Sequence, residues 1–283
     1  MSIAWRPPPE VIASSNVGHF MAAHGIESFD GLLARSIDDP AWFWGEVVTF
    51  LGIEFATPYE RVLDTSDGIP WAKWFVGGTT SFAHNCVDRH AAVVGERTAL
   101  VWEGEDGEVV SWTYAELRRQ ADGLAAMLAE RGVGPGDAVG IFMPMLPETV
   151  AAVLAVAKLG AVFLPIFSGY APEAISVRLE DAAAKAVITA DGFYRRGSTV
   201  DMKAAADKAV ASVRSVETVV VVPRLGTPIE IHGGRDVMWP AATSTPFPTE
   251  MVDSEHTLFI AYTSGTTGRP KGSVHVHGGW TVK

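Results

Sequence analysis

The residues best suited to chemistry form one short run near the end of the sequence, YTSGTTGRPKG at positions 262–272. Its glycines allow positive φ angles, so the backbone can come close to an anion. Its hydroxyl and backbone N–H groups are hydrogen-bond donors, and Lys271 adds a positive charge. This combination is suited to closing over the phosphates of a nucleotide.

The elements before this run predict where it lies. Short strands rich in Val, Ile and Ala are expected at 138–142, 161–164, 186–189, 218–222 and 257–262, and the first four are separated by helices that begin at Pro147, at Pro172 and near residue 202. This alternation predicts an α/β layered domain of parallel βαβ units, with helices on both faces of the sheet. Ligands of such open sheets bind beyond the carboxyl ends of the strands, where the run begins.

Before residue 95 the sequence has a different character. It is rich in aromatic residues, with short helical patterns at 16–24, 28–37 and 40–50, and we expect Trp42, Phe43, Trp44 and Phe50 to pack inward. We therefore divide the chain into a helical amino-terminal extension, 1–94, and the first part of a larger domain, 95–283.

The larger domain begins with a predicted hairpin. Residues 100–112 read as two strands around Asp106-Gly107, a favoured turn sequence. Thr113 and Glu116 then have the spacing of a capping box and predict the start of a helix. Its apolar residues share one face and include Leu117, Ala121, Leu124 and Leu128.

Composition excludes several classes of protein. The 283 residues are 48% hydrophobic and carry a formal charge of −11, which is typical of a folded protein and unfavourable for nonspecific binding to nucleic acid or to anionic membranes. The single cysteine, Cys86, excludes an internal disulfide and fits a reducing, cytoplasmic location. The amino terminus lacks the apolar core of a secretory signal.

One apolar segment, 149–167, is about as long as a bilayer span. Lys158, Gly160 and Pro165 interrupt it. We therefore expect a buried helix followed by a buried strand, and no membrane-spanning segment.

Two kinds of phosphate loop can be compared with the run. The common nucleotide-binding loop requires Gly-x-x-x-x-Gly-Lys and then Ser or Thr. Counted from Gly265, Pro270 stands at the second glycine and Gly272 at the hydroxyl residue, so this pattern fails. The run instead resembles the signature of the adenylate-forming enzymes, which include acyl-CoA synthetases, luciferases and the adenylation domains of peptide synthetases. The alternative is a surface loop that is rich in Gly and Thr by accident.

Further stretches resemble one branch of this superfamily. WAKWFVGG at 71–78 and NCVDRH at 85–90 are similar to the amino-terminal region of acetyl-CoA synthetases and their short-chain relatives, and HVHGG at 275–279 resembles the segment after their phosphate loop. The resemblance implies an incomplete amino-terminal domain of the adenylate-forming fold, because members of the family are much longer. It also implies that the carboxyl-terminal half, with the catalytic lysine, is the missing partner of this chain.

The reaction implied by the resemblance has two steps. A small carboxylate is activated by ATP, with Mg²⁺, as an acyl-adenylate, and the acyl group is then transferred to the thiol of coenzyme A. The residues that would bind ATP are Thr263, Ser264, Gly265, Thr266, Thr267, Gly268 and Lys271. No catalytic residue is assigned within this chain.

The coenzyme A site is marked by DGFYRRG at 191–197, which aligns with the place where acetyl-CoA synthetases contact the phosphates of coenzyme A. The resemblance assigns Arg195, Arg196, Gly197 and Ser198 to this contact, since guanidinium groups bind phosphate well. Ser198 stands where the family has a second basic residue, and adjacent Arg196 could compensate. The alternative is a pair of solvated arginines at a strand-to-helix turn.

Other reactive side chains have simpler interpretations. His84, Cys86 and His90 do not have zinc-ligand spacing, and we expect no metal site. Cys86 is expected to be a small buried residue and not a nucleophile. His275 and His277 are expected to point the same way on a strand, as a polar pair beside the site.

Two hypotheses follow. The first is the amino-terminal portion of an acyl-CoA synthetase, inactive by itself, and the second is a noncatalytic piece that binds nucleotide or another protein. The acid substrate and the oligomeric state stay open, because most residues of the acyl pocket are expected after position 283.

Overall fold

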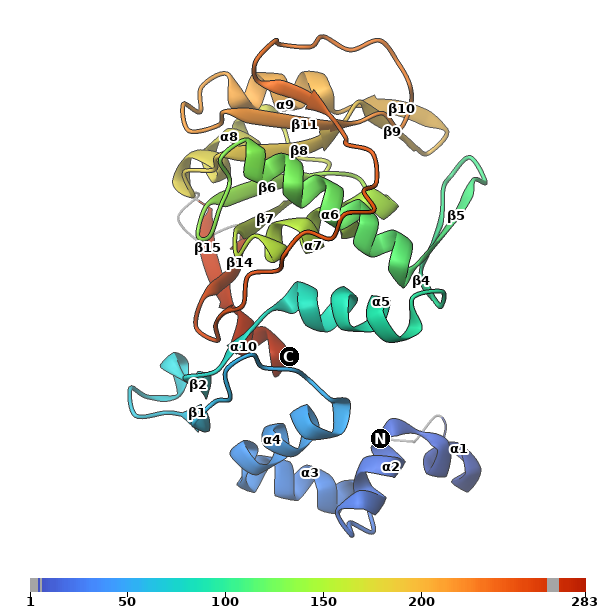
Figure 1. Cartoon of the computed structure of the whole chain (residues 1–283), viewed down its shortest axis with the longest axis vertical. Coiled ribbons are helices and arrows are strands. Elements are labelled where there is room, and N and C mark those ends of the chain that lie inside the picture. The colour runs from blue at the N-terminus through green and yellow to red at the C-terminus, as the bar shows by residue number, and fades with distance from the viewer. Residues whose placement is uncertain (1–4, 6, 264–269) are drawn as a thin grey trace.

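A seven-stranded sheet forms the centre of the protein in the computed structural model, which describes residues 5, 7–263 and 270–283 (Figure 1). The order of the strands is β12-β11-β8-β6-β7-β14-β15. All neighbours are parallel except β14 and β15, which are antiparallel. The strands are β6 (Ala138–Phe142), β7 (Val162–Ile166), β8 (Ala186–Ala190), β11 (Thr218–Val222), β12 (Asp236–Met238), β14 (Thr257–Thr263) and β15 (Lys271–Val276). The α/β sheet predicted from the sequence is confirmed.

Two pairs of helices accompany the sheet: α6 (Tyr114–Glu130) packs on α7 (Pro147–Lys158), and α8 (Pro172–Asp181) packs on α9 (Lys203–Val210). In Figure 1, α6 lies in front of the sheet. Its start is the predicted capping box, in which Thr113 Oγ1 accepts from the Glu116 N–H and the Glu116 carboxylate accepts from the Thr113 N–H. Every residue of β6, β8 and β11 is buried, as expected of strands covered on both faces.

The helix and strand predicted at 149–167 are also present, as α7 and β7. No helix among the described residues is long and apolar enough to cross a membrane. Lys158, at the end of α7, is only 1% exposed and forms ion pairs with Asp88 and Asp122. The charge that interrupts this apolar segment is therefore part of an internal ion cluster.

Two hairpins project beside the sheet. β4 (Thr98–Glu103) and β5 (Val109–Thr113) form the predicted hairpin around Asp106-Gly107, with Gly107 at φ 79°. The second hairpin, β9 (Gly192–Arg195) with β10 (Ser198–Asp201), was not predicted. The segment expected to be a strand-to-helix turn is thus a hairpin, whose turn residues Arg196 and Gly197 have φ angles of 52° and 74°.

The amino-terminal segment is helical, as predicted, with α1 (Pro9–Ser14), α2 (Asn16–Ala23), α3 (Phe29–Asp38) and α4 (Pro40–Leu51). Phe20, Met21 and Leu32 form a small core there, and Trp42 and Phe43 pack against it. Trp44 is half-buried and its ring meets that of Trp74. Phe50 is 38% exposed, so the expectation that it packs inward is wrong. Phe50 only touches Phe20 edge-on from the end of α4.

Short elements join the helical segment to the sheet. They are β1 (Arg61–Asp64), a 3₁₀ turn (Ile69–Trp71), β2 (Lys73–Val76), β3 (Thr79–Thr80), a π-helical turn (His84–Asp88), α5 (Arg89–Val94) and β13 (Val252–Asp253). β1 pairs with β2, and β3 pairs with β13. The division of the chain between residues 94 and 95 stays a prediction.

Three flat rings line up across the edge of the sheet. The ring of Phe163 in β7 stacks on that of Phe259 in β14, with centroids 4.9 Å apart. Phe259 in turn stacks on His275 in β15 at 4.3 Å. After β15 the chain enters α10 (His277–Thr281). The strand that carries Lys271 is therefore linked to the sheet by side chains as well as by its pairing with β14.

Candidate active site

The glycine-rich run lies between the last two strands of the sheet. Thr263 is the last residue of β14, Lys271 is the first residue of β15, and the two are cross-strand partners. Because β14 is parallel to β7, the run leaves the carboxyl edge of the sheet, as expected. Thr263 and Lys271 are both exposed there. The predicted ligands Ser264, Gly265, Thr266, Thr267 and Gly268 lie outside the described residues.

Tyr262 fastens the start of the run to α8. Its hydroxyl donates a hydrogen bond to Asp181 Oδ2 at 2.7 Å. The Arg178 guanidinium, one turn earlier in α8, lies 5.8 Å from the centre of the Tyr262 ring and 4.3 Å from that of Tyr170. Burial and the adjacent Asp181 carboxylate raise the pKa of Tyr262 well above its usual value, so the phenol is protonated at neutral pH.

A cavity of about 340 Å³ lies beside the β9–β10 hairpin. It is open at the carboxyl ends of β7 and β11, and its lining includes Trp102, Phe167, Ser168, Tyr194, Arg195 and Arg224. Its size is at the lower end of the range of small-molecule sites. Within the described part of the chain Arg195 forms no salt bridge, so its charge can be used by a ligand.

The structure separates the four residues assigned to coenzyme A. Arg195 lines the cavity, whereas Arg196, Gly197 and Ser198 form the exposed turn and the start of β10. The Arg196 N–H donates to Glu105 Oε1 at 3.0 Å, and the Gly197 N–H donates to Glu105 Oε2 at 3.4 Å. The turn therefore presents two backbone donors to one carboxylate.

Arg224 was not singled out from the sequence. It follows β11, and its guanidinium donates to Asp106 at 2.6 Å and to Glu108 at 2.7 Å. It also lies over the rings of Trp102 and Tyr194. A basic residue just after a buried parallel strand is the signal that could have identified it, since that edge of the sheet holds ligands.

The reactive residues near the amino-terminal junction make other contacts. His84 Nε2 bonds Glu54 at 2.7 Å, and the His90 ring packs against Tyr114. Cys86 is exposed, which corrects the expectation that it is buried: it borders a cavity of about 180 Å³. Partial desolvation by its neighbours still raises the pKa of its thiol to about 11, so it is not an activated nucleophile.

His275 and His277 do not form a pair on one strand. His275 is in β15, while His277 is the first residue of α10 and only 2% exposed. His277 Nδ1 accepts from the Phe82 N–H at 3.2 Å, and burial lowers the pKa of its ring to about 4. His277 is therefore a neutral residue of the interior, and the expectation of a shared orientation was wrong because the strand ends at Val276.

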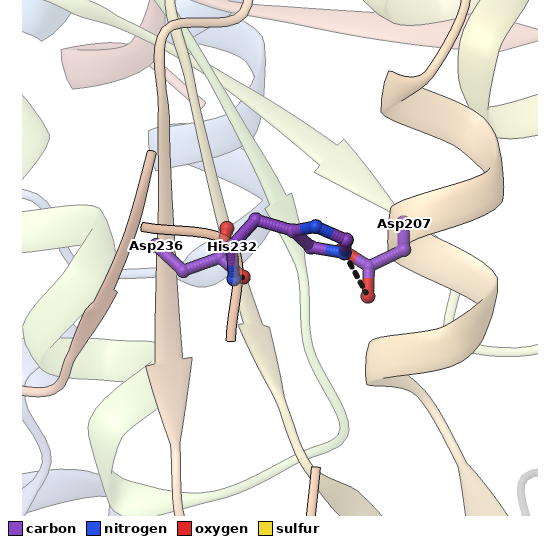
Figure 2. Close-up of side chains that lie close together, drawn as sticks. All are labelled: Asp207, His232 and Asp236. Carbon is purple, nitrogen blue, oxygen red and sulfur yellow. Dashed lines mark hydrogen bonds and ion pairs between the residues drawn. The ribbon is translucent and has the colours of Figure 1, made fainter. Parts of the chain in front are cut away.

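Asp207, His232 and Asp236 have donor atoms close enough to suggest a metal site, and no other such group occurs among the described residues (Figure 2). Two cationic side chains, Lys203 and Arg235, already pair with the carboxylates of this group. Lys203 Nζ lies 2.6 Å from Asp207 Oδ2 and 2.8 Å from Asp236 Oδ2, and Arg235 bonds both carboxylates. The group is therefore an internal salt-bridge network, and its carboxylates are not available to a metal ion.

Comparison with known proteins identifies the family. Residues 87–282 match the model of the AMP-binding enzymes, and residues 29–86 match that of the acetyl-coenzyme A synthetase amino terminus. The chain is 43% identical to acetyl-coenzyme A synthetase of Mycolicibacterium smegmatis over 99% of its length, and 41% identical to that of Chlorobaculum tepidum over 98%. The acetoacetyl-CoA synthetase of Streptomyces lividans has the same fold, with a TM-score of 0.90 and 32% identity over 98% of this chain.

The chain spans only part of each of these proteins. It covers 29% and 41% of the two acetyl-coenzyme A synthetases and 44% of the acetoacetyl-CoA synthetase. The matching region includes both the glycine-rich run and the cavity with Arg195, and the two family models together reach from residue 29 to residue 282. The chain therefore belongs to the AMP-binding enzyme family and corresponds to an amino-terminal part of the acetyl-coenzyme A synthetase type.

Proposed function

We propose that this chain supplies the ATP-binding and coenzyme A-binding surfaces of an acid–thiol ligase that activates a short carboxylate. One observation carries the proposal: the two described ends of the glycine-rich run, Thr263 and Lys271, face each other at the carboxyl edge of β14. These two residues lie at the edge where open α/β sheets bind their ligands, and they flank the residues that the family signature assigns to ATP.

In the first step, a carboxylate oxygen attacks the α-phosphorus of ATP. A P–O bond forms, pyrophosphate leaves, and the product is an acyl-adenylate. Both reactants are anions, so neutralising charge and holding the two groups in line account for most of the catalysis. Lys271 would hold the β- and γ-phosphates, and the hydroxyl and N–H groups of residues 263–268 would bind their oxygens.

Mg²⁺ would supply further charge neutralisation when it is bound with ATP. Its preferred ligands are phosphate oxygens with one or two carboxylates. The group of possible metal ligands among the described residues contains Asp207 and Asp236, whose carboxylates are paired with Lys203 and Arg235. We expect Mg²⁺ to arrive with the nucleotide.

In the second step, the thiol of coenzyme A attacks the acyl carbonyl and AMP leaves. The cavity beside the β9–β10 hairpin is our candidate for the coenzyme A site. Arg195 would bind a phosphate there, and Phe167, Tyr194 and Trp102 offer apolar surface for an aromatic base. The names of the relatives, acetyl-coenzyme A and acetoacetyl-CoA synthetases, support a small acid as the substrate.

The alternative is a noncatalytic chain that only binds nucleotide. We expect the 283-residue chain by itself not to catalyse the exchange of pyrophosphate into ATP, since it spans less than half the length of the relatives described above. Calorimetric titration with MgATP and with coenzyme A tests binding, and pyrophosphate exchange with acetate, propionate and acetoacetate tests the reaction. Binding of neither ligand would contradict the proposal, and measurable exchange would contradict the expected inactivity.

A further inference from the structure

The turn of the β9–β10 hairpin presents two adjacent backbone N–H groups to a carboxylate of the same chain. Arg196 and Gly197 both have positive φ angles, so their consecutive N–H groups point toward the same side of the turn. Consecutive N–H groups in this arrangement form a concave site for an anion. Both oxygens of Glu105 occupy it, at 3.0 and 3.4 Å.

Glu105 comes from the other hairpin, at the turn between β4 and β5, far from Arg196 in the sequence. The neighbouring acidic residues of that turn, Asp106 and Glu108, bind Arg224. Both Glu105 and Arg224 line the same cavity as Arg195. The acidic turn thus covers two groups that would otherwise attract an anion into the cavity: the backbone site and the Arg224 guanidinium.

Arg195 is left available. It is the residue just before the turn, is exposed, and forms no salt bridge with any described carboxylate. An anionic ligand that reaches Arg195 is therefore brought next to the two N–H groups held by Glu105. A phosphate and the Glu105 carboxylate cannot occupy the same two donors at once.

We propose that Glu105 is an internal competitor for the phosphate site of the 195–198 turn, and that coenzyme A binds by displacing it. This inference rests on the proposed coenzyme A site. The Glu105 carboxylate lowers the affinity of the turn for any anion that contacts only these N–H groups. A ligand that also contacts other residues of the cavity can displace the carboxylate. Glu105 is thus a specificity-determining residue that makes no contact with the bound ligand.

Two variants separate direct competition from a general charge effect. Glu105→Gln removes the charge. Glu105→Asp keeps the charge but shortens the side chain by one methylene, so it no longer reaches both N–H groups. Glu103→Gln is the matched control, because Glu103 lines the same cavity and, among the described residues, forms no hydrogen bond or ion pair with the turn.

The measurement is calorimetric titration of the full chain with coenzyme A and with 3′-dephospho-coenzyme A. We expect Glu105→Gln and Glu105→Asp each to bind coenzyme A about 2- to 10-fold more tightly than the unmodified protein, the range set by one or two hydrogen bonds. The gain in affinity of the Glu105 variants should be smaller for 3′-dephospho-coenzyme A, which lacks the 3′-phosphate. Glu103→Gln should gain less affinity for coenzyme A than either Glu105 variant. In NMR spectra, coenzyme A should shift the Arg196 and Gly197 amide signals.

The other outcomes are distinct. If coenzyme A binds, and Arg195→Ala weakens it, but the two Glu105 variants bind equally or less tightly, then Glu105 stabilises the turn and the inference is wrong while the site stands. If only Glu105→Gln gains affinity, the effect is long-range charge and direct competition is rejected. If coenzyme A binds neither the unmodified protein nor any variant, both the proposed coenzyme A site and the role of Glu105 are wrong.

Discussion

The hydroxyl of Tyr262 donates a hydrogen bond to Asp181 Oδ2 at 2.7 Å, and this contact joins the start of the glycine-rich run to the end of α8. Asp181 is the last residue of its helix, and Tyr262 is the first residue of the run. The start of the run thus contacts a helix that is distant in the sequence and contributes no residue to the signature.

Tyr262→Phe removes this hydrogen bond and keeps the ring. We expect the free energy of unfolding to fall by about 1 kcal/mol, the usual contribution of one hydrogen bond, and the affinity for MgATP to fall as well because the run loses its anchor. Urea unfolding and calorimetry measure the two effects. Tyr59→Phe is the control, since the Tyr59 ring packs on Phe55 and Phe75 and its hydroxyl has no partner among the described residues. Equal losses in both variants would contradict the assigned role.

Lys271→Ala should weaken MgATP binding. Lys271 is exposed at the start of β15 and would make a charge-assisted contact with phosphate, which contributes about 1.5–3 kcal/mol. The loss should appear in the dissociation constant with little change in stability, because an exposed lysine contributes little to folding. Lys208→Ala, at an exposed position of α9, is the matched control. An unchanged nucleotide affinity in Lys271→Ala would show that another group holds the phosphates.

Asp122→Ala should strongly destabilise the protein. Lys158 Nζ lies 2.6 Å from Asp88 and 3.0 Å from Asp122, and Lys158 and Asp122 are each only 1% exposed. Removing Asp122 leaves a buried ammonium with one partner, which costs about 3–5 kcal/mol. Asp137→Ala breaks a partly exposed pair with Lys185 and a hydrogen bond from the Gly134 N–H, and should cost about 1–2 kcal/mol. Chemical unfolding compares the two, and similar costs would refute the assigned difference.

Asp236 should make stability depend on acid pH. Burial alone would raise its pKa, but bonds from Arg235, the His232 N–H and Lys203 outweigh burial and hold the pKa at about 2. The folded-state pKa is below that of the unfolded chain, so the stabilisation is complete above about pH 4 and is lost as the pH falls toward 2. We expect a loss on the order of 2 kcal/mol across this window.

Asp236→Asn tests this dependence. It should be less stable at pH 6 and should lose less stability than the unmodified protein between pH 4 and pH 2. Unfolding curves at several pH values measure both. Parallel stability curves for the two proteins would show that other carboxylates control the acid response.

Local sequence patterns predicted the strands β6, β7, β8, β11 and β14 and the helices between them, whereas the edge strand β12 was not predicted. Thr113 and Glu116 predicted their own capping box, and the buried strands were predicted from runs of apolar residues. The β9–β10 hairpin was missed because its turn places Arg196 at a positive φ angle, which its residue type does not indicate. Cys86 was misjudged because exposure depends on how the junction packs.

The candidate site was only partly predictable for a similar reason. Thr263, Lys271 and Arg195 were assigned from the resemblance. The structure places Thr263 and Lys271 at the carboxyl edge of the sheet and Arg195 at the cavity, and their roles stay predictions. Arg224 and Glu105 were not identified. Their importance depends on contacts between two hairpins that are far apart in the chain, and no local pattern reports such contacts.

The three aligned rings of Phe163, Phe259 and His275 connect the strand bearing Lys271 to the interior of the sheet. The main chains of β14 and β7 have one partner pair, Phe259 with Phe163, whereas β14 and β15 are paired along most of their length. The stacked rings therefore couple β15 to β7 through β14, in addition to the main-chain pairing. A substitution at any of the three rings would be felt by the strand that carries Lys271, although none of the three belongs to the glycine-rich run.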